Sequence, residues 1–284
     1  MTQFVSFADQ IVPSPPEATA PVPEGLRYII ATSQRTGSTL LCDGLASTGI
    51  AGMPDEWFLP ENKANAALMR QFGALSEGDY IDQVIRATAT PNGVFGTKLF
   101  WAQWDSLIPK MIAKSNFPVD RPLRNVLADL LTAGLGSPIK YVWLRRRNML
   151  AQAISLYRAQ NTGVWRSVSG RGDQDTVVDH ELPFDFGAIT TVLRRFEDED
   201  QKWTSYFRTY RIPALMLFYE DFVENYERTV QGVLKFLGLP YENVAVGPPK
   251  LERQADERSR EWEALYREMA VQTAVMVEGA SRNE

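Results

Sequence analysis

The segment from Ser33 to Thr39 (SQRTGST) has the composition of an anion-binding turn. It lies between an apolar run and a helical one, which is where parallel α/β proteins bind phosphate. Gly37 permits a tight turn, and the amides of Gly37, Ser38 and Thr39 would converge on an anion at the start of the helix. Arg35 adds a full positive charge. The pattern therefore predicts an anion cradle.

The alternative is an ordinary strand-to-helix turn in which the hydroxyl of Ser38 or Thr39 caps the helix. The turn is not a Walker A loop, which requires the pattern G-x-x-x-x-G-K-[ST]. Thr32 stands where that pattern has its first glycine, and Ser38 stands where it has its lysine. A nucleoside triphosphatase is therefore disfavoured.

A second basic group follows another apolar run. Arg145, Arg146 and Arg147 come directly after Ile139 to Leu144, at the carboxyl end of a predicted buried strand. Ser155 lies two helical turns further on, where its hydroxyl would face the same ligand as Arg147. Either the arginines bind a second anion or they cap the strand in solvent. Two anion sites at neighbouring strand ends favour a nucleotide with two separated phosphates.

Glu56 is a carboxylate followed by two aromatic residues. It lies in the segment from Gly52 to Phe58 (GMPDEWF), where Trp57 and Phe58 would form an apolar wall beside it. The alternative is a solvated carboxylate in a surface loop. Lys98 lies within an apolar strand, where an unpaired ammonium is costly to desolvate, so it must meet an anion or snorkel to water at a sheet edge.

Other classes of chemistry are disfavoured by what the sequence lacks. The single histidine, His180, removes most histidine triads and multi-histidine metal sites. The single Cys42 cannot form an internal disulfide or a zinc cluster, and it fits a reducing cytoplasm. The chain of 284 residues has a net charge of -5, which opposes nucleic acid and anionic membranes. No apolar run reaches the roughly 20 residues of a membrane helix.

Buried strands and the helices between them must position these groups. The strands are expected at Leu26 to Thr32, Gly93 to Phe100, Ile139 to Leu144 and Ala214 to Tyr219. Helical spacing of apolar residues predicts helices at Leu40 to Ser47, Asp79 to Ala89, Leu123 to Ala133, Asn148 to Gln160, Phe186 to Tyr210, Phe222 to Leu237 and Glu257 to Val277. The alternation predicts an α/β fold with a parallel sheet flanked by helices.

The predicted domain organisation is a proline-rich arm at residues 1–26 and one domain at residues 27–284. Val164 to Pro183 has no clear periodicity and is expected to be a long loop over a site.

The order of the motifs resembles that of sulfotransferases. These enzymes carry a 5′-phosphosulfate loop after the first strand and an R-x-x-x-x-x-x-x-S segment for the 3′-phosphate of 3′-phosphoadenylyl sulfate (PAPS). The sequence is most similar to the bacterial PAPS-dependent sulfotransferases of the trehalose 2-sulfotransferase type. Hallmarks of that type look like Ser33 to Leu41, Gly52 to Phe58, Pro91 to Leu99, Val164 to Arg166 and Leu251 to Asp256.

This resemblance implies a P-loop-like sulfotransferase fold, PAPS as co-substrate, no metal and a homodimer. It implies Glu56 as the general base, with Lys98 and Arg35 stabilising the sulfuryl group or the leaving phosphate. The residues implied for PAPS binding are Arg35, Thr36, Gly37, Ser38, Thr39, Arg147, Ser155, Trp165, Arg253 and Gln254. The acceptor implied is a carbohydrate hydroxyl, with Gln34 and Glu56 as its hydrogen-bond partners.

One position departs from the sugar-acting members of that type. In those enzymes, as the resemblance implies, the residue after the glycine that corresponds to Gly52 is acidic. This chain has Met53 there, which is a poor hydrogen-bond partner for sugar hydroxyls. A sugar other than trehalose, or a more apolar alcohol, is therefore open. Two further functions also stay open: a P-loop kinase, which needs a Walker lysine and magnesium, and a non-catalytic nucleotide-binding protein, which would not need Glu56.

Overall fold

The computed structural model describes residues 24–58, 70, 77–107, 135, 138–165, 182–249 and 257–281. The chain divides into two compact units, residues 1–145 with 200–249 (unit 1) and residues 146–199 with 250–284 (unit 2). Several predictions lie outside the described residues: the arm up to residue 23, the helix at Leu123 to Ala133, and most of the loop from Val164 to Pro183. The same holds for His180, Arg253 and Gln254.

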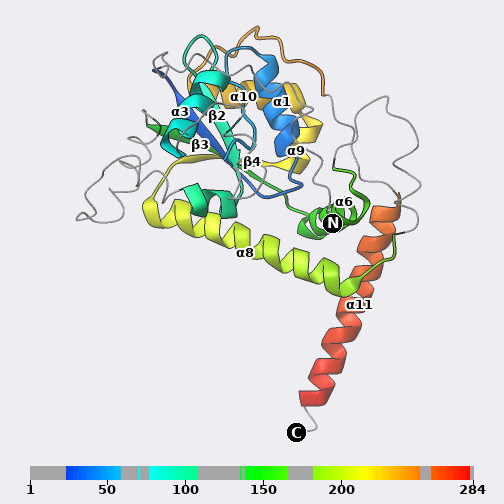
Figure 1. The fold of residues 1–284 in the computed structure, drawn as a ribbon. Helices are drawn as coiled ribbons and strands as arrows, with labels where there is room; N and C mark the ends of the chain where they lie inside the picture. Colours follow the sequence, from blue (N-terminus) through cyan, green and yellow to red (C-terminus); the bar gives the residue numbers. More distant parts are fainter. Residues whose placement is uncertain are drawn as a thin grey trace, which may run out of the picture. The chain divides into compact units, whose positions relative to one another are not determined.

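Unit 1 contains a parallel sheet, as predicted. Its described strands are β1 (Arg27–Ala31), β2 (Phe95–Leu99), β3 (Ile139–Arg145) and β4 (Ala214–Phe218), in the spatial order β2-β1-β3-β4 (Figure 1). Ala31 at the end of β1 is level with Leu99 of β2 and Trp143 of β3. Because all pairs are parallel, the carboxyl ends of the strands lie along one edge of the sheet.

Helices cover both faces of this sheet, because alternate strand residues are apolar on each side. Tyr28 and Ile30 of β1 pack with α1 (Ser38–Ser47), α9 (Tyr219–Glu224) and α10 (Tyr226–Leu237). Ile29 and Ala31 pack on the opposite side with α3 (Glu77–Thr88) and with the last turns of α8 (Phe186–Tyr210). The fold is therefore a three-layer α/β arrangement, which confirms the predicted class.

The single helix predicted at Phe222 to Leu237 is wrong. The structure has two helices, α9 and α10, that are separated by Asn225 with φ -131° and ψ 49°. Asparagine favours such a break because its side chain competes for nearby backbone groups; here Asn225 Nδ2 donates to Asp221 O at 3.3 Å. The predicted end of the helix is confirmed, because Gly238 caps α10 in the left-handed conformation.

The described part of unit 2 is helical. The helices α6 (Met149–Thr162) and α11 (Glu257–Ser281) pack with the first part of α8 around a core that includes Ile154, Phe196 and Trp262. Asn148 holds two elements together, because its Oδ1 accepts from Ala151 N at 3.0 Å and its Nδ2 donates to Glu263 Oε2 at 2.9 Å.

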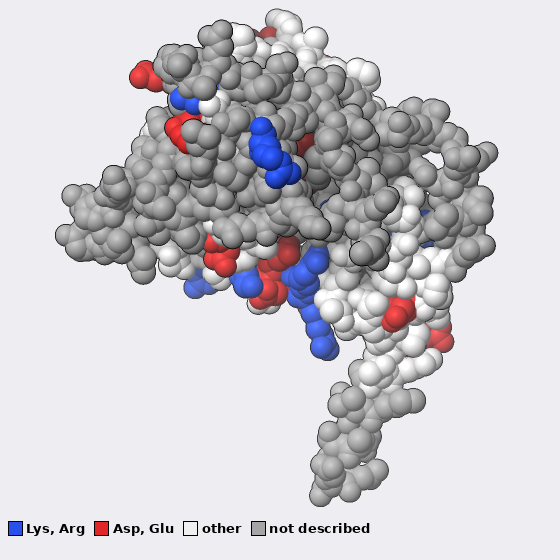
Figure 2. Space-filling view, in the orientation of Figure 1, with Lys and Arg blue, Asp and Glu red and all other residues white. Residues whose placement is uncertain are grey.

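The exposed side of α8 carries charges of both signs. Arg194 and Arg195 precede Glu197, Asp198 and Glu199, and Arg195 Nε lies 3.6 Å from Glu199 Oε1. In Figure 2, blue and red side chains of described residues are interleaved in this region. A surface that binds nucleic acid instead gathers positive charge on one face.

Candidate active site

The turn after β1 holds two residues in the left-handed region of backbone conformation. Arg35 has φ 64° and Gly37 has φ 78°. Left-handed residues at alternate positions direct successive N–H groups toward one point, which is the geometry of an anion-binding nest. A residue with a side chain is rarely found in this region, so the conformation of Arg35 must be held by its surroundings.

Gly37 is the N-cap of α1, and it has no side chain that could accept a hydrogen bond from the N–H groups of the first helical turn. The alternative that Ser38 or Thr39 caps the helix is therefore wrong: the helix begins at Ser38. Because the first N–H groups of a helix have no intrahelical partner, the amides of Ser38 and Thr39 are available to an anion. A Cβ at position 37 would lie 2.6 Å from Tyr219 Cδ2, so only glycine fits here.

Two threonines brace this turn from inside. The hydroxyls of Thr32 and Thr36 lie 2.6 Å apart, and Thr36 Oγ1 donates to Ser33 O at 3.0 Å. Thr32 Oγ1 also lies 3.0 Å from Leu144 O near the end of β3, so Leu144 O and the Thr36 hydroxyl compete for its single proton. Thr36 is fully buried, and its hydroxyl is engaged within the turn rather than facing an anion.

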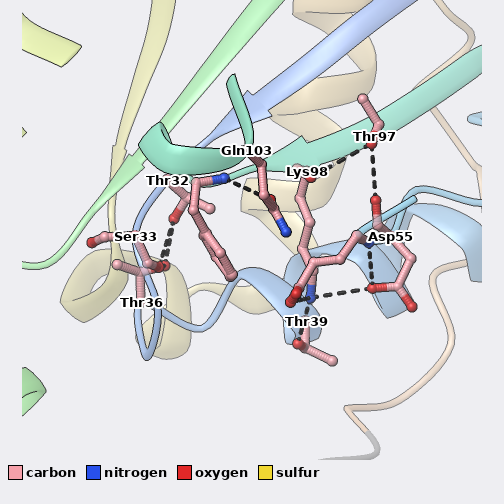
Figure 3. A network of polar contacts seen from close by, with 10 residues as sticks. Thr32, Ser33, Thr36, Thr39, Asp55, Thr97, Lys98 and Gln103 are labelled. Atoms are coloured by element: carbon pink, nitrogen blue, oxygen red, sulfur yellow. Dashed lines mark hydrogen bonds and ion pairs between the residues drawn. The ribbon is translucent and has the colours of Figure 1, made fainter. Parts of the chain in front are cut away.

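Lys98 of β2 lies at the centre of the polar network beside this turn (Figure 3). Its Nζ is 2.9 Å from Thr39 Oγ1, 3.2 Å from Asp55 Oδ1 and 3.0 Å from Glu56 Oε1. The ammonium has three N–H donors, and each has an acceptor within reach. Lys98 is 1% exposed, so the alternative of a snorkelling edge residue is wrong, and the anions that it meets are two carboxylates.

The charges of this network favour the ammonium form of Lys98. Burial alone would lower the pKa of Lys98, but the carboxylates of Glu56 and Asp55 outweigh burial and raise this pKa above its ordinary value. The buried thiol of Cys42 faces the same charges, and burial raises its pKa. Lys98 therefore carries a full positive charge at neutral pH.

The bond between Lys98 and Thr39 also sets the direction of the threonine proton. An ammonium only donates, so Thr39 Oγ1 accepts in this bond. Its own O–H is left to donate elsewhere, and it lies in the first turn of α1, next to the amides of Ser38 and Thr39. This hydroxyl is thus a further donor for an anion in the turn.

Asp55 is a central member of the network, and the sequence prediction missed it. Its Oδ1 accepts from Glu56 N at 2.8 Å, and its backbone oxygen accepts from Lys98 N and Thr97 Oγ1, both at 3.0 Å. Its position in the turn sequence Gly-Met-Pro-Asp could have indicated this role, because the side chain of an aspartate in a turn often accepts hydrogen bonds from nearby backbone N–H groups. Asp55 thereby fixes both the backbone at Glu56 and the ammonium of Lys98.

The segment from Gly52 to Phe58 lies along β2. Gly52 has φ 74°, and a Cβ there would lie 2.9 Å from Val94 O, so the segment approaches the strand too closely for another residue. Trp57 and Phe58 are 8% and 4% exposed and join the core. The Glu56 side chain is 15% exposed and paired with Lys98, which contradicts the alternative of a solvated loop carboxylate. Gln34 is half-buried in the turn after β1.

Arg145, the last residue of β3, and Arg147 beyond it have different environments. Arg145, in unit 1, makes a bidentate pair with Asp200 at 2.7 and 2.5 Å, and its guanidinium lies 4.4 Å from the centre of the Trp143 ring. Arg145 is therefore engaged within the protein rather than solvated or held ready for a second anion. Arg147 is exposed in unit 2.

Two other predicted ligand residues also belong to unit 2. Ser155 lies half-buried on α6, and Trp165 packs against the core of unit 2 beyond the end of that helix. Trp104 and Tyr157 are core residues.

Within the described ranges, no three side chains of His, Cys, Asp or Glu are grouped so as to hold a metal ion. No helix in the described part of the chain is long and apolar enough to cross a membrane.

Comparison with known proteins gives one consistent family. The sequence model described as Stf0 sulphotransferase matches residues 27–269. The trehalose 2-sulfotransferase of Mycolicibacterium smegmatis is 32% identical over 266 residues, which cover 84% of this chain and 94% of that protein. The trehalose 2-sulfotransferase of Mycobacterium tuberculosis is 31% identical over 264 residues, with the same coverage of 84% and 94%. The matched residues include all four described strands and parts of both units.

Proposed function

The chain belongs to the Stf0 sulphotransferase family, and we propose that it transfers a sulfuryl group from PAPS to a hydroxyl group of a carbohydrate, with Glu56 as general base. The observation that carries this proposal is the contact of Lys98 with both Thr39 and Glu56. It joins an anion-binding helix start to a carboxylate, the two parts that sulfuryl transfer requires.

The reaction exchanges one sulfur–oxygen bond for another. The acceptor oxygen forms a bond to sulfur as its proton passes to the Glu56 carboxylate. The bond between sulfur and the phosphate oxygen breaks, and its electron pair stays on the 5′-phosphate, so adenosine 3′,5′-bisphosphate leaves. Negative charge grows on that phosphate, and fixed donors nearby would stabilise it.

Unit 1 offers several such donors. We assign the 5′-phosphosulfate to the turn from Arg35 to Thr39, which supplies the amides of Gly37, Ser38 and Thr39, the Thr39 hydroxyl and the charge of Arg35. Lys98 is assigned to the sulfuryl group or the leaving phosphate, because its Nζ lies 2.9 Å from Thr39 in the first turn of α1.

The rest of the nucleotide is assigned to other predicted residues. Arg147 and Ser155 are proposed for the 3′-phosphate, and Trp165, Arg253 and Gln254 for the remainder of the donor. A cytoplasmic location and a homodimer are also part of the proposal.

The acceptor is proposed to be a sugar because both relatives are named for trehalose. Gln34 and Glu56 are its proposed partners. A non-trehalose sugar or a more apolar alcohol is the second candidate, which Met53 favours. This residue is half-buried. Its N–H donates to Thr88 O at 2.8 Å, and its carbonyl accepts from Trp57 Nε1 at 2.9 Å. Only its thioether side chain is therefore left to contact the acceptor substrate.

The test is transfer of labelled sulfate from PAPS to trehalose and to a panel of sugars and alcohols. We expect transfer by the wild type, and a loss of roughly 10²- to 10⁴-fold in kcat for Glu56→Gln. Glu227→Gln on the exposed side of α10 is the matched control. No transfer to any member of the panel would remove the proposed activity, and wild-type turnover by Glu56→Gln would remove the base.

A further inference from the structure

Gln103 is a buried glutamine that follows β2 in the helical segment of residues 101–107. Its side chain is 3% exposed, and its Oε1 accepts from the backbone N–H of Phe100 at 2.9 Å. A glutamine in the first turn that accepts from the N–H of the capping residue forms half of a capping box. The bond holds the amide in one place at the carboxyl end of β2.

The same bond decides which way the amide faces. A backbone N–H only donates, so Oε1 faces Phe100 and the Nε2 group must point elsewhere. In Figure 3 the amide nitrogen of Gln103 points away from this bond, toward Lys98. Within the described part of the chain, no acceptor bonds to Nε2.

The surroundings favour an anionic oxygen as the missing acceptor. Thr32 N donates to Leu99 O at 3.1 Å, so the start of the anion-binding turn and the segment before Gln103 lie at the same edge of the sheet. Lys98 shares its N–H groups with Thr39, Asp55 and Glu56, so a sulfuryl group beside it would be held more firmly by a further donor. The fixed Nε2 group of Gln103 is such a donor.

We infer that Gln103 binds the sulfate donor by donating a hydrogen bond from Nε2 to an oxygen of the sulfuryl group. The inference rests on the proposed function. It adds a neutral donor, positioned by its own helix cap, to the residues that hold the transferring group.

Gln103→Glu is the sharpest test, because a carboxylate still accepts from Phe100 N–H but presents negative charge where the amide donated. We expect calorimetric affinity for PAPS to fall roughly 10- to 100-fold, since the lost bond is to a charged group. Affinity for adenosine 3′,5′-bisphosphate, which lacks the sulfuryl group, should change less than about threefold. Gln201→Glu, an exposed glutamine of α8, adds the same charge as a matched control.

Other outcomes overturn the inference. Unchanged PAPS affinity, alone or with a raised KM for the acceptor, would mean that Nε2 does not meet the sulfuryl group. An equal loss for both nucleotides would assign Gln103 a structural role. If Gln103→Glu does not fold, Gln103→Met is the test variant, because it removes the donor without adding charge. It should weaken binding of PAPS but not binding of adenosine 3′,5′-bisphosphate. Absence of PAPS binding by the wild type would instead remove the proposed function.

Discussion

At the scale of residues, the site consists of one buried ammonium shared by two carboxylates. A buried charge is stable only when it is paired. If Glu56 takes up the acceptor proton, Lys98 still has Asp55 3.2 Å away as its counter-ion. The second carboxylate therefore lets Glu56 change its charge without leaving the ammonium unpaired.

Asp55 should be measurable through stability. Asp55→Ala removes the acceptor of Glu56 N–H and one partner of Lys98, so we expect it to lower the free energy of unfolding by about 1–3 kcal/mol. Asp55→Asn keeps the acceptor and should lower it less. The measurement is urea unfolding followed by tryptophan fluorescence, with the exposed Asp105→Ala as control. Equal stability of Asp55→Ala and the wild type would contradict this role.

The residues that sequence reasoning found are those whose own type is unusual in its place. Lys98 in an apolar strand and Glu56 in an aromatic segment are examples. Asp55 and Gln103 were not predicted, because their roles depend on contacts with β2 and with the start of the helix after it. No local sequence pattern encodes which atoms come into contact there. Thr36 has a suitable type, but its hydroxyl points into the turn.

At the scale of elements, apolar runs and helical periodicity were sufficient to predict all four described strands and most helices. Burial on both faces makes parallel strands nearly continuous apolar runs. The break at Asn225 was not predictable from periodicity, because α9 and α10 together keep the apolar spacing of one helix and only a local backbone preference separates them. The missing side-chain cap of α1 likewise depends on Gly37 taking the capping position.

The turn after β1 offers a matched pair of glycine substitutions. Gly37 and Gly49 have similar φ values of 78° and 69°, but a Cβ at Gly37 would meet Tyr219 at 2.6 Å and one at Gly49 would meet nothing within 4 Å. Gly37→Ala should therefore weaken binding of adenosine 3′,5′-bisphosphate at least about tenfold, whereas Gly49→Ala should cost only stability. Titration calorimetry and thermal unfolding measure the two effects. Equal nucleotide affinity in both variants would show that the turn does not bind the anion.

At the scale of the whole molecule, net charge and local charge have opposite signs. The chain carries -5 overall, so an anionic nucleotide must be recognised by the fixed donors of a local site rather than by a general field. Unit 1 contains the turn, Glu56 and Lys98, and unit 2 contains Arg147 and Ser155. The family match across residues 27–269 includes residues of both units. The single domain and the proline-rich arm stay predictions.

This chain is proposed to bind a nucleotide through two separated phosphates, and titration calorimetry tests that binding directly. We predict micromolar binding of adenosine 3′,5′-bisphosphate without metal and much weaker binding of ATP with magnesium. Arg147→Ala should lower the affinity for the bisphosphate at least about tenfold, since it removes a charged partner of one phosphate. Arg194→Ala on α8 should leave this affinity unchanged. Preference for magnesium ATP would favour the kinase alternative, and no binding of the bisphosphate would show that the chain has no site for two separated phosphates.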